Sequence, residues 1–291
     1  MGRKDARLVK ELDSMHVIVP LLYPGRCDNE AFISESIDLT NINAYLERKN
    51  ELLAQQTPEG EEPFKYTIFH LIVTAMMKTI RLRPKMNWFI QNKRIYERKE
   101  ITSAFVVKKQ FSDHGTEALA VVRGEDDDTI DTIHDKIKAQ VFSSRSEQKD
   151  GSTEAMDIVS KLPFWIVRFF VWLMRKLDVH GKVPGSLIES DPYYCSVVLS
   201  NLGSIKLRSG YHHLTNWGTN SVIVIIGEKK MRPFFAEDGS YEMKDSLDLG
   251  ITIDERIADG YYYSRTIKLL KKLLENPELL EKPLTEEIDY D

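Results

Sequence analysis

Residues 221–226, a serine followed by five Val and Ile side chains, constrain the fold more than any other stretch. A continuous apolar run of this length is typical of a strand buried on both faces of a sheet. Shorter β-type patterns predict further strands, and i, i+3, i+4 spacing of apolar residues predicts helices between them. The expected strands lie at 88–96, 101–109, 117–122, 196–200 and 247–253, with Gly115 in one turn and Gly239 in another, and the expected helices at 66–82, 130–141 and 260–274.

The N-terminal and C-terminal ends carry weaker patterns. Residues 7–15 suggest a short helix, and 17–22 suggest a strand that stops at Pro24-Gly25 and is followed by a returning strand at 32–37. Thr40 is the expected N-cap of the next helix, and 55–63 is the expected loop. The last eleven residues are acidic, and we expect them to be loose.

Composition excludes several classes of protein. The 291 residues are 42% hydrophobic and 29% charged, which is typical of a globular domain that needs neither a disulfide nor a metal. A net charge of −5 argues against nucleic acid as a partner. Two cysteines without metal-ligand spacing predict no metal and a reducing compartment, and no segment is typical of a signal peptide or a membrane span. We therefore expect a cytoplasmic protein.

Residues 143–160 are polar and predict a flexible or exposed connection, which leads to 162–181, the most unusual segment of the sequence. From Leu162 to Met174 the sequence is apolar on nearly every helical face, interrupted by Pro163 and Arg168. An ordinary surface helix has a narrower apolar stripe. Two hypotheses remain open: a helix buried between subunits or under a loop, and a helix at 162–177 that contacts a membrane surface through Trp and Phe.

Two collinear motifs carry a family resemblance. Ser200-Asn201-Leu202-Gly203 ends a predicted strand, and Asp254-Glu255-Arg256-Ile257-Ala258-Asp259-Gly260 precedes a helix that ends in Leu-Leu-Glu-Asn-Pro at 273–277. This order resembles the catalytic domains of dihydrolipoyl acyltransferases and chloramphenicol acetyltransferases over about residues 6–281. The resemblance implies one α/β domain over 1–291, an α+β two-layer sandwich with helices on one side of a mixed sheet. The apolar segment at 143–193 would be an insertion, and no lipoyl or subunit-binding domain and no lipoyl group is expected on this chain.

The resemblance also implies a mechanism. Members of the family bind coenzyme A and an acyl acceptor in a tunnel between the subunits of a trimer, where a histidine acts as general base. Carried over, Ser200 would donate a hydrogen bond to the oxyanion. Asp259 would be a structural acid paired with an arginine, while Gly260 and Arg256 would shape the turn. Arg3, Arg7 and Arg26 are candidate partners of Asp259, and the sequence does not choose among them.

The sequence departs from the family at the base, because Glu255 stands where the histidine is expected. A free glutamate titrates near ~4.3 and a thiol near ~8.5, so a carboxylate is a poor base for a thiol. Burial raises the pKa of a carboxyl group and makes it a better base. Amine, hydroxyl or water acceptors therefore fit this position better than a thiolate. The alternative is a salt bridge between Glu255 and a nearby cation, without chemistry.

His212 and His213 offer a second source of a base. They lie between Ser200 and the strand at 221–226, and in an extended chain only one of the two would face a pocket. The alternative is a pair of structural histidines. Asn201, Asn216, Trp217 and Thr219 are candidate substrate-binding residues because they flank these positions.

We accordingly expect an acyltransferase that moves an acyl group from acyl-CoA, its substrate, to a small acceptor, as a homotrimer. The alternative from another class is an inactive family member that acts as an oligomeric ligand-binding or scaffolding protein. A third hypothesis is a peripheral membrane protein that acts through 162–177.

Overall fold

The computed structural model describes residues 3–108, 117–145 and 161–290. Gly115 and the polar connection at 146–160 lie outside these residues. The main sheet runs in the order β2-β10-β8-β7-β5-β6, and β9 pairs with the outer part of β10. Its strands are β2 (Glu30–Asp38), β5 (Ile101–Lys108), β6 (Glu117–Gly124), β7 (Val197–Asn201), β8 (Val222–Ile226), β9 (Lys230–Phe235) and β10 (Tyr241–Asp254).

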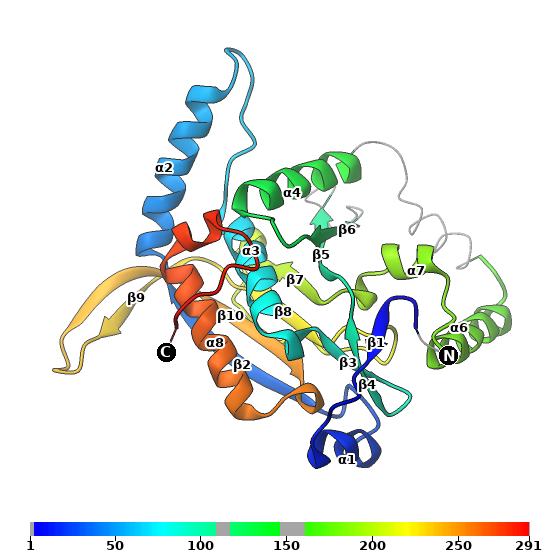
Figure 1. Ribbon diagram of the computed structural model, residues 1–291. Helices are drawn as coiled ribbons and strands as arrows, with labels where there is room; N and C mark the ends of the chain where they lie inside the picture. Colours follow the sequence, from blue (N-terminus) through cyan, green and yellow to red (C-terminus); the bar gives the residue numbers. More distant parts are fainter. Residues whose placement is uncertain (1–2, 109–116, 146–160, 291) are drawn as a thin grey trace.

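The sheet is mixed, as the sequence predicted. β8 is its buried centre, parallel to β7 and antiparallel to β10. Helices cover one face (Figure 1), with α3, α4 and α8 supplying most of the apolar contacts. The predicted fold class is thus confirmed. The helices are α2 (Thr40–Gln56), α3 (Ile68–Leu82), α4 (Ile130–Arg145), α6 (Phe164–Val179), α7 (Gly185–Ser190) and α8 (Gly260–Glu275).

The opposite face of the sheet is crossed by the connection between β7 and β8, residues 202–221. Gly250 on β10 makes this possible, because a Cβ there would lie 2.0 Å from the carbonyl oxygen of Gly210. Leu214 from the connection packs on Ile223 and Ile225 of β8. This loop therefore carries the residues after Ser200 across the sheet toward β2.

The N-terminal prediction was wrong. Residues 6–8 form strand β1 (Ala6–Leu8), which pairs with β4 (Arg94–Arg98), and the register places Arg7 opposite Glu97. Ser14–Leu22 is helix α1, not a strand, because Asp13 caps it by accepting a hydrogen bond from the His16 backbone N–H. Tertiary packing and the cap override the β propensity of the Val and Ile residues.

Other boundaries shifted for local reasons. The expected strand at 88–96 is a hairpin of β3 (Trp88–Gln91) and β4, turned at Asn92 and Lys93, which both have positive φ. The strand at 30–38 pairs with β10 rather than with the preceding segment. Thr40 is the first residue of α2 and donates to Asp38 through its N–H and hydroxyl.

The C-terminal tail is packed, not loose. Leu280 and Leu284 are fully buried, and the ammonium of Lys78 on α3 donates to the carbonyl oxygens of Leu279, Lys282 and Pro283. Within the predicted tail the acidic composition hid one apolar anchor, Leu284, and Leu280 lies just before it.

Candidate functional site

The turn after β10 is built around a buried carboxylate, Asp254. Arg256 binds it with two hydrogen bonds of 2.7 Å and donates to the Tyr23 carbonyl oxygen as well. Arg26 places its Nε 3.7 Å from the other side of the same carboxylate and donates to the carbonyl oxygens of Thr215 and Gly218. Two arginines thus tie α1, the 202–221 connection and the turn to one acid.

Glu255 follows directly and has a different environment. Its backbone N–H donates to the Asn29 carbonyl oxygen at 2.9 Å, which fixes the turn, while its side chain is exposed. In the described part of the chain no side chain forms an ion pair with Glu255, since Arg256 is engaged by Asp254. The expected alternative, a salt bridge that neutralises Glu255, does not occur among those residues.

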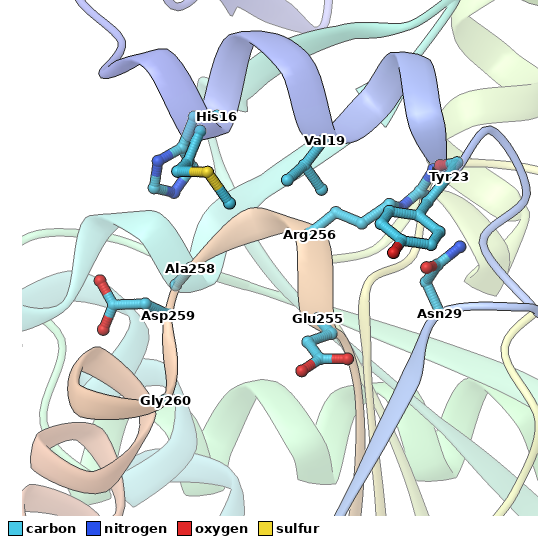
Figure 2. Close-up of a pocket in the computed structure, with 10 residues that line it drawn as sticks. His16, Val19, Tyr23, Asn29, Glu255, Arg256, Ala258, Asp259 and Gly260 are labelled. Atoms are coloured by element: carbon cyan, nitrogen blue, oxygen red, sulfur yellow. Dashed lines mark hydrogen bonds between the residues drawn. The ribbon is translucent and has the colours of Figure 1, made fainter.

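Two cavities meet at Glu255. One, of about 490 Å³, lies between α1 and the turn, and Figure 2 shows its lining, with His16 and Tyr23 on α1 and Glu255 and Asp259 on the turn. The other, of about 470 Å³, lies between β2 and α8 and is lined by Glu35, Tyr263 and Lys268, among others. Glu255 therefore lines a cavity on each side of the turn, and Figure 2 shows its carboxylate pointing away from α1.

Asp259 caps α8, since its carboxylate accepts the Tyr262 N–H at 2.8 Å, and Gly260 begins the helix. The resemblance implied an arginine partner for Asp259. In the structure the arginines are paired elsewhere: Arg26 and Arg256 with Asp254, Arg3 with Asp5 and Asp178, and Arg7 with Glu97. The buried acid of this motif is its first aspartate, not its second.

Ser200 lies far from this turn. It is half-buried on β7, level with Ile225 of β8, which is in turn opposite Gly250 of β10. Glu255 follows Gly250 by five residues, which is about 17 Å at the usual rise of a strand. Ser200 is level with Gly250, so this distance also separates Ser200 from Glu255 along the strand direction. A single chain does not bring Ser200 and Glu255 together. Asn201, beside Ser200, accepts the Ser204 N–H and caps a short 3₁₀ turn.

The histidine pair lies nearer to Glu255 than to Ser200. The Nδ1 of His213 is 3.0 Å from Oε2 of Glu30, and Glu30 is opposite Asp254 in the β2–β10 ladder. The His213 side chain is 84% exposed, and the Nδ1 of His212 contacts the carbonyl oxygen of His213. The two imidazole rings therefore contact different groups.

The other predicted binding residues hold the loop in place. The Oδ1 of Asn216 accepts the Arg26 N–H, and Trp217 donates to Asp191. Thr219 is buried and accepts from Arg98. Burial raises the pKa of Asp191, although the Trp217 hydrogen bond opposes that shift. Asn216 and Trp217 also line a small cavity of about 210 Å³ beneath α6.

Sequence reasoning missed His16. Its Nδ1 lies 2.6 Å from Oδ2 of Asp13, its ring meets Trp88 edge-on, and only 10% of its side chain is exposed. The His16 N–H that Asp13 accepts lowers the pKa of that carboxyl. His16 lines the same cavity as Glu255. The pattern Asp-x-x-His at a helix start was a usable signal, lost because 17–22 was interpreted as a strand.

Among the described residues no group of three or more His, Cys, Asp or Glu side chains is placed to hold a metal ion. Both cysteines are free, and burial raises the pKa of the Cys195 thiol to about 11. Candidate chemistry at the turn is thus that of carboxylates and imidazoles.

Comparison with known proteins finds a family model that matches part of the chain. Residues 185–281, which include both motifs, match the model of the 2-oxoacid dehydrogenases acyltransferase catalytic domain. The resemblance stated from the sequence is confirmed. A search of curated proteins found no match to the chain.

Solved structures show the same fold at low sequence identity. A probable dihydrolipoamide acetyltransferase from Listeria monocytogenes 4b F2365 is 14% identical, with a TM-score of 0.59 over 98% of this chain and 99% of that one. A chloramphenicol acetyltransferase is 11% identical, with a TM-score of 0.56 over 92% of this chain and 99% of that one. The dihydrolipoamide acetyltransferase of Azotobacter vinelandii is 14% identical, with a TM-score of 0.54 over 94% and 93%.

Proposed function

We propose that this protein transfers an acyl group from acyl-CoA to a small hydroxyl or amine acceptor. One observation carries the proposal: Glu255, whose carboxylate has no ion-pair partner among the described residues, lines two cavities at the turn where the resembled acyltransferases keep their catalytic histidine. Two cavities that meet at one base suit a reaction with two substrates. Lys268 lines the cavity beside α8 and is a candidate contact for a coenzyme A phosphate.

The complete site would form between copies of the chain. Ser200 and Glu255 are separated by about 17 Å along the strand direction as well as by two strand spacings, so the oxyanion donor must come from a neighbouring copy. A homotrimer is the assembly that the family resemblance implies. The likeness to the cubic core of a pyruvate dehydrogenase complex, with a TM-score of 0.53, is compatible with that assembly.

The chemistry follows from these positions. Glu255 would take the proton of the acceptor hydroxyl or amine as its oxygen or nitrogen attacks the thioester carbonyl. The hydroxyl of Ser200 from the neighbouring copy would donate to the oxyanion. Collapse of the tetrahedral intermediate breaks the carbon–sulfur bond, and the departing thiolate recovers the proton from Glu255. His16 and His213 are rival bases, because each lies near Glu255 and each contacts a carboxylate.

Calorimetry with coenzyme A and acetyl-CoA comes first, followed by an acceptor screen that measures released thiol. Glu255→Gln should lower kcat by about 100-fold or more, and Ser200→Ala by about 100- to 1,000-fold. Glu59→Gln, in an exposed loop, is the matched control and should leave the rate unchanged. If His16→Gln lowers kcat while Glu255→Gln does not, the base is His16.

Mixing two inactive variants tests assembly of the site. If Ser200 and Glu255 act across an interface, trimers re-formed from Ser200→Ala and Glu255→Gln should regain about one quarter of the wild-type rate, because that share of random interfaces is intact. No recovery would contradict a site that Ser200 and Glu255 share between copies. Saturable coenzyme A binding without turnover of hydroxyl, amine or thiol acceptors would favour a ligand-binding scaffold.

A further inference from the structure

Helix α6 leaves six large apolar side chains exposed to solvent. Phe164 is 79% exposed and Trp165 is 72% exposed, and four more large side chains in the next two turns are open to solvent. Figure 1 shows α6 at the edge of the molecule, apart from the main sheet. The four further side chains are Phe169, Phe170, Val171 and Trp172.

Five of these six side chains lie within a broad arc of about 160° around the helix axis, and Phe170 lies outside it. Successive residues of an α-helix are about 100° apart, so Phe164, Trp165 and Phe170 face three widely separated directions. The side of α6 with Ile166, Val167 and Met174 is half-buried. A groove on another protein would cover only part of so broad an exposed arc, whereas a fluid lipid interface can adapt to its shape.

The C-terminal end of α6 is anchored to the domain, so the exposed aromatic end has a fixed position. Asp178 is buried, accepts from Arg3 at 2.9 Å through its carboxylate and its carbonyl, and also accepts from Gln91. Gly181 has a φ of +65° and lies against Arg3, where a Cβ would lie 2.7 Å from the Arg3 Cγ. Contacts within the domain therefore order the last turn of α6.

Charge identifies the partner. The only acidic residue at 161–182 is Asp178, which is neutralised by Arg3, whereas the same stretch carries five cations. This excess stands out on a chain with a net charge of −5. Basic residues beside Trp and Phe are typical of helices that bind anionic membrane surfaces. The five cations are Lys161, Arg168, Arg175, Lys176 and Lys182.

Length sets the mode of binding. α6 has 16 residues and is about 24 Å long, shorter than the hydrocarbon core of a bilayer. No helix among the described residues is long and apolar enough to cross a membrane. Contact would therefore be interfacial, with the aromatic end among the headgroups and the upper acyl chains.

We infer that α6 binds the surface of a membrane containing anionic phospholipid, through its exposed aromatic side chains and the cations that flank them. This inference does not depend on acyl transfer, and its test uses no acyl substrate. A second copy of the chain is the competing occupant.

Vesicle flotation of the full chain tests the inference. The protein should float with vesicles of phosphatidylcholine mixed with phosphatidylglycerol, and at least tenfold less with phosphatidylcholine alone. The double variant Trp165→Ser, Phe169→Ser should lose at least tenfold in apparent affinity. So should Arg168→Glu combined with Lys176→Glu, and rising salt should weaken the wild type.

The matched control is Phe235→Ser on β9, since Phe235 is an aromatic residue of similar exposure, at 71%, far from α6. It should float as the wild type does. A far-ultraviolet circular dichroism melt of each variant establishes that it is folded. Failure to float on the mixed vesicles, or equal loss with Phe235→Ser, overturns the inference. So does light scattering that shows an oligomer which Trp165→Ser, Phe169→Ser dissociates, because α6 would then be covered by a second copy.

Discussion

Helices α3 and α6 have nearly the same length and are both rich in large apolar side chains, yet they occupy opposite environments. Every residue of α3 from His70 to Ile80 is buried between the sheet and neighbouring helices. In α6 only Asp178 is buried. Apolar composition identifies both helices as candidates for burial, but within residues 3–108, 117–145 and 161–290 the fold covers only α3. For α6 we propose a membrane surface as the cover.

The largest expected difference is in stability. Leu71→Ala in α3 should lower the free energy of unfolding by about 2–5 kcal/mol, because it opens a cavity in a fully buried site. Phe169→Ala in α6 should change it by less than about 0.5 kcal/mol, because that side chain is already exposed. Urea denaturation of both variants checks the pair. A large loss at Phe169 would mean that α6 is covered in solution.

The cations in the two helices offer a sharper contrast. Lys78 in α3 is fully buried, and burial lowers its pKa. Its ammonium group donates hydrogen bonds to three carbonyl oxygens near the C-terminus. Lys78→Met should cost about 1–3 kcal/mol by leaving those carbonyls without a donor. It should also speed hydrogen exchange at residues 277–290. Arg168→Met in α6, the matched control, should leave exchange in the tail unchanged.

A last contrast depends on pH. Burial and the nearby His134 lower the pKa of His70 from the ordinary 6.5 to about 3, so His70 is neutral in the folded protein. The unfolded chain binds a proton there as pH falls below 6.5, and this contribution to stability is lost between pH 6.5 and about 3. The slope from this one group is at most about 1.4 kcal/mol per pH unit.

The measurement is the free energy of unfolding at several pH values for the wild type and for His70→Gln. The gap between them should be largest above pH 6.5 and shrink as pH falls. His180→Gln, just after α6 and exposed, is the control and should leave the pH dependence unaltered. A gap that stays constant with pH would show that His70 is not buried as a neutral ring.

The local pattern of the sequence determined much of this protein. The apolar run at 222–226, the periodicity of α3 and α8 and the two collinear motifs placed the buried strand, the main helices and the family resemblance. These features depend on residues close together in the chain, and their burial agrees with their periodicity. Capping also acts locally, as Asp259 shows at the start of α8.

Only the tertiary structure decided which distant groups meet. It made 14–22 a helix, gave both arginines to Asp254 instead of Asp259, and set Ser200 and Glu255 at different levels of the sheet. Strand register and ion pairing join residues far apart in the sequence, so no local pattern encodes them. The same reason explains why the sequence left α6 open to two hypotheses, and why the fold that buries α3 leaves α6 exposed.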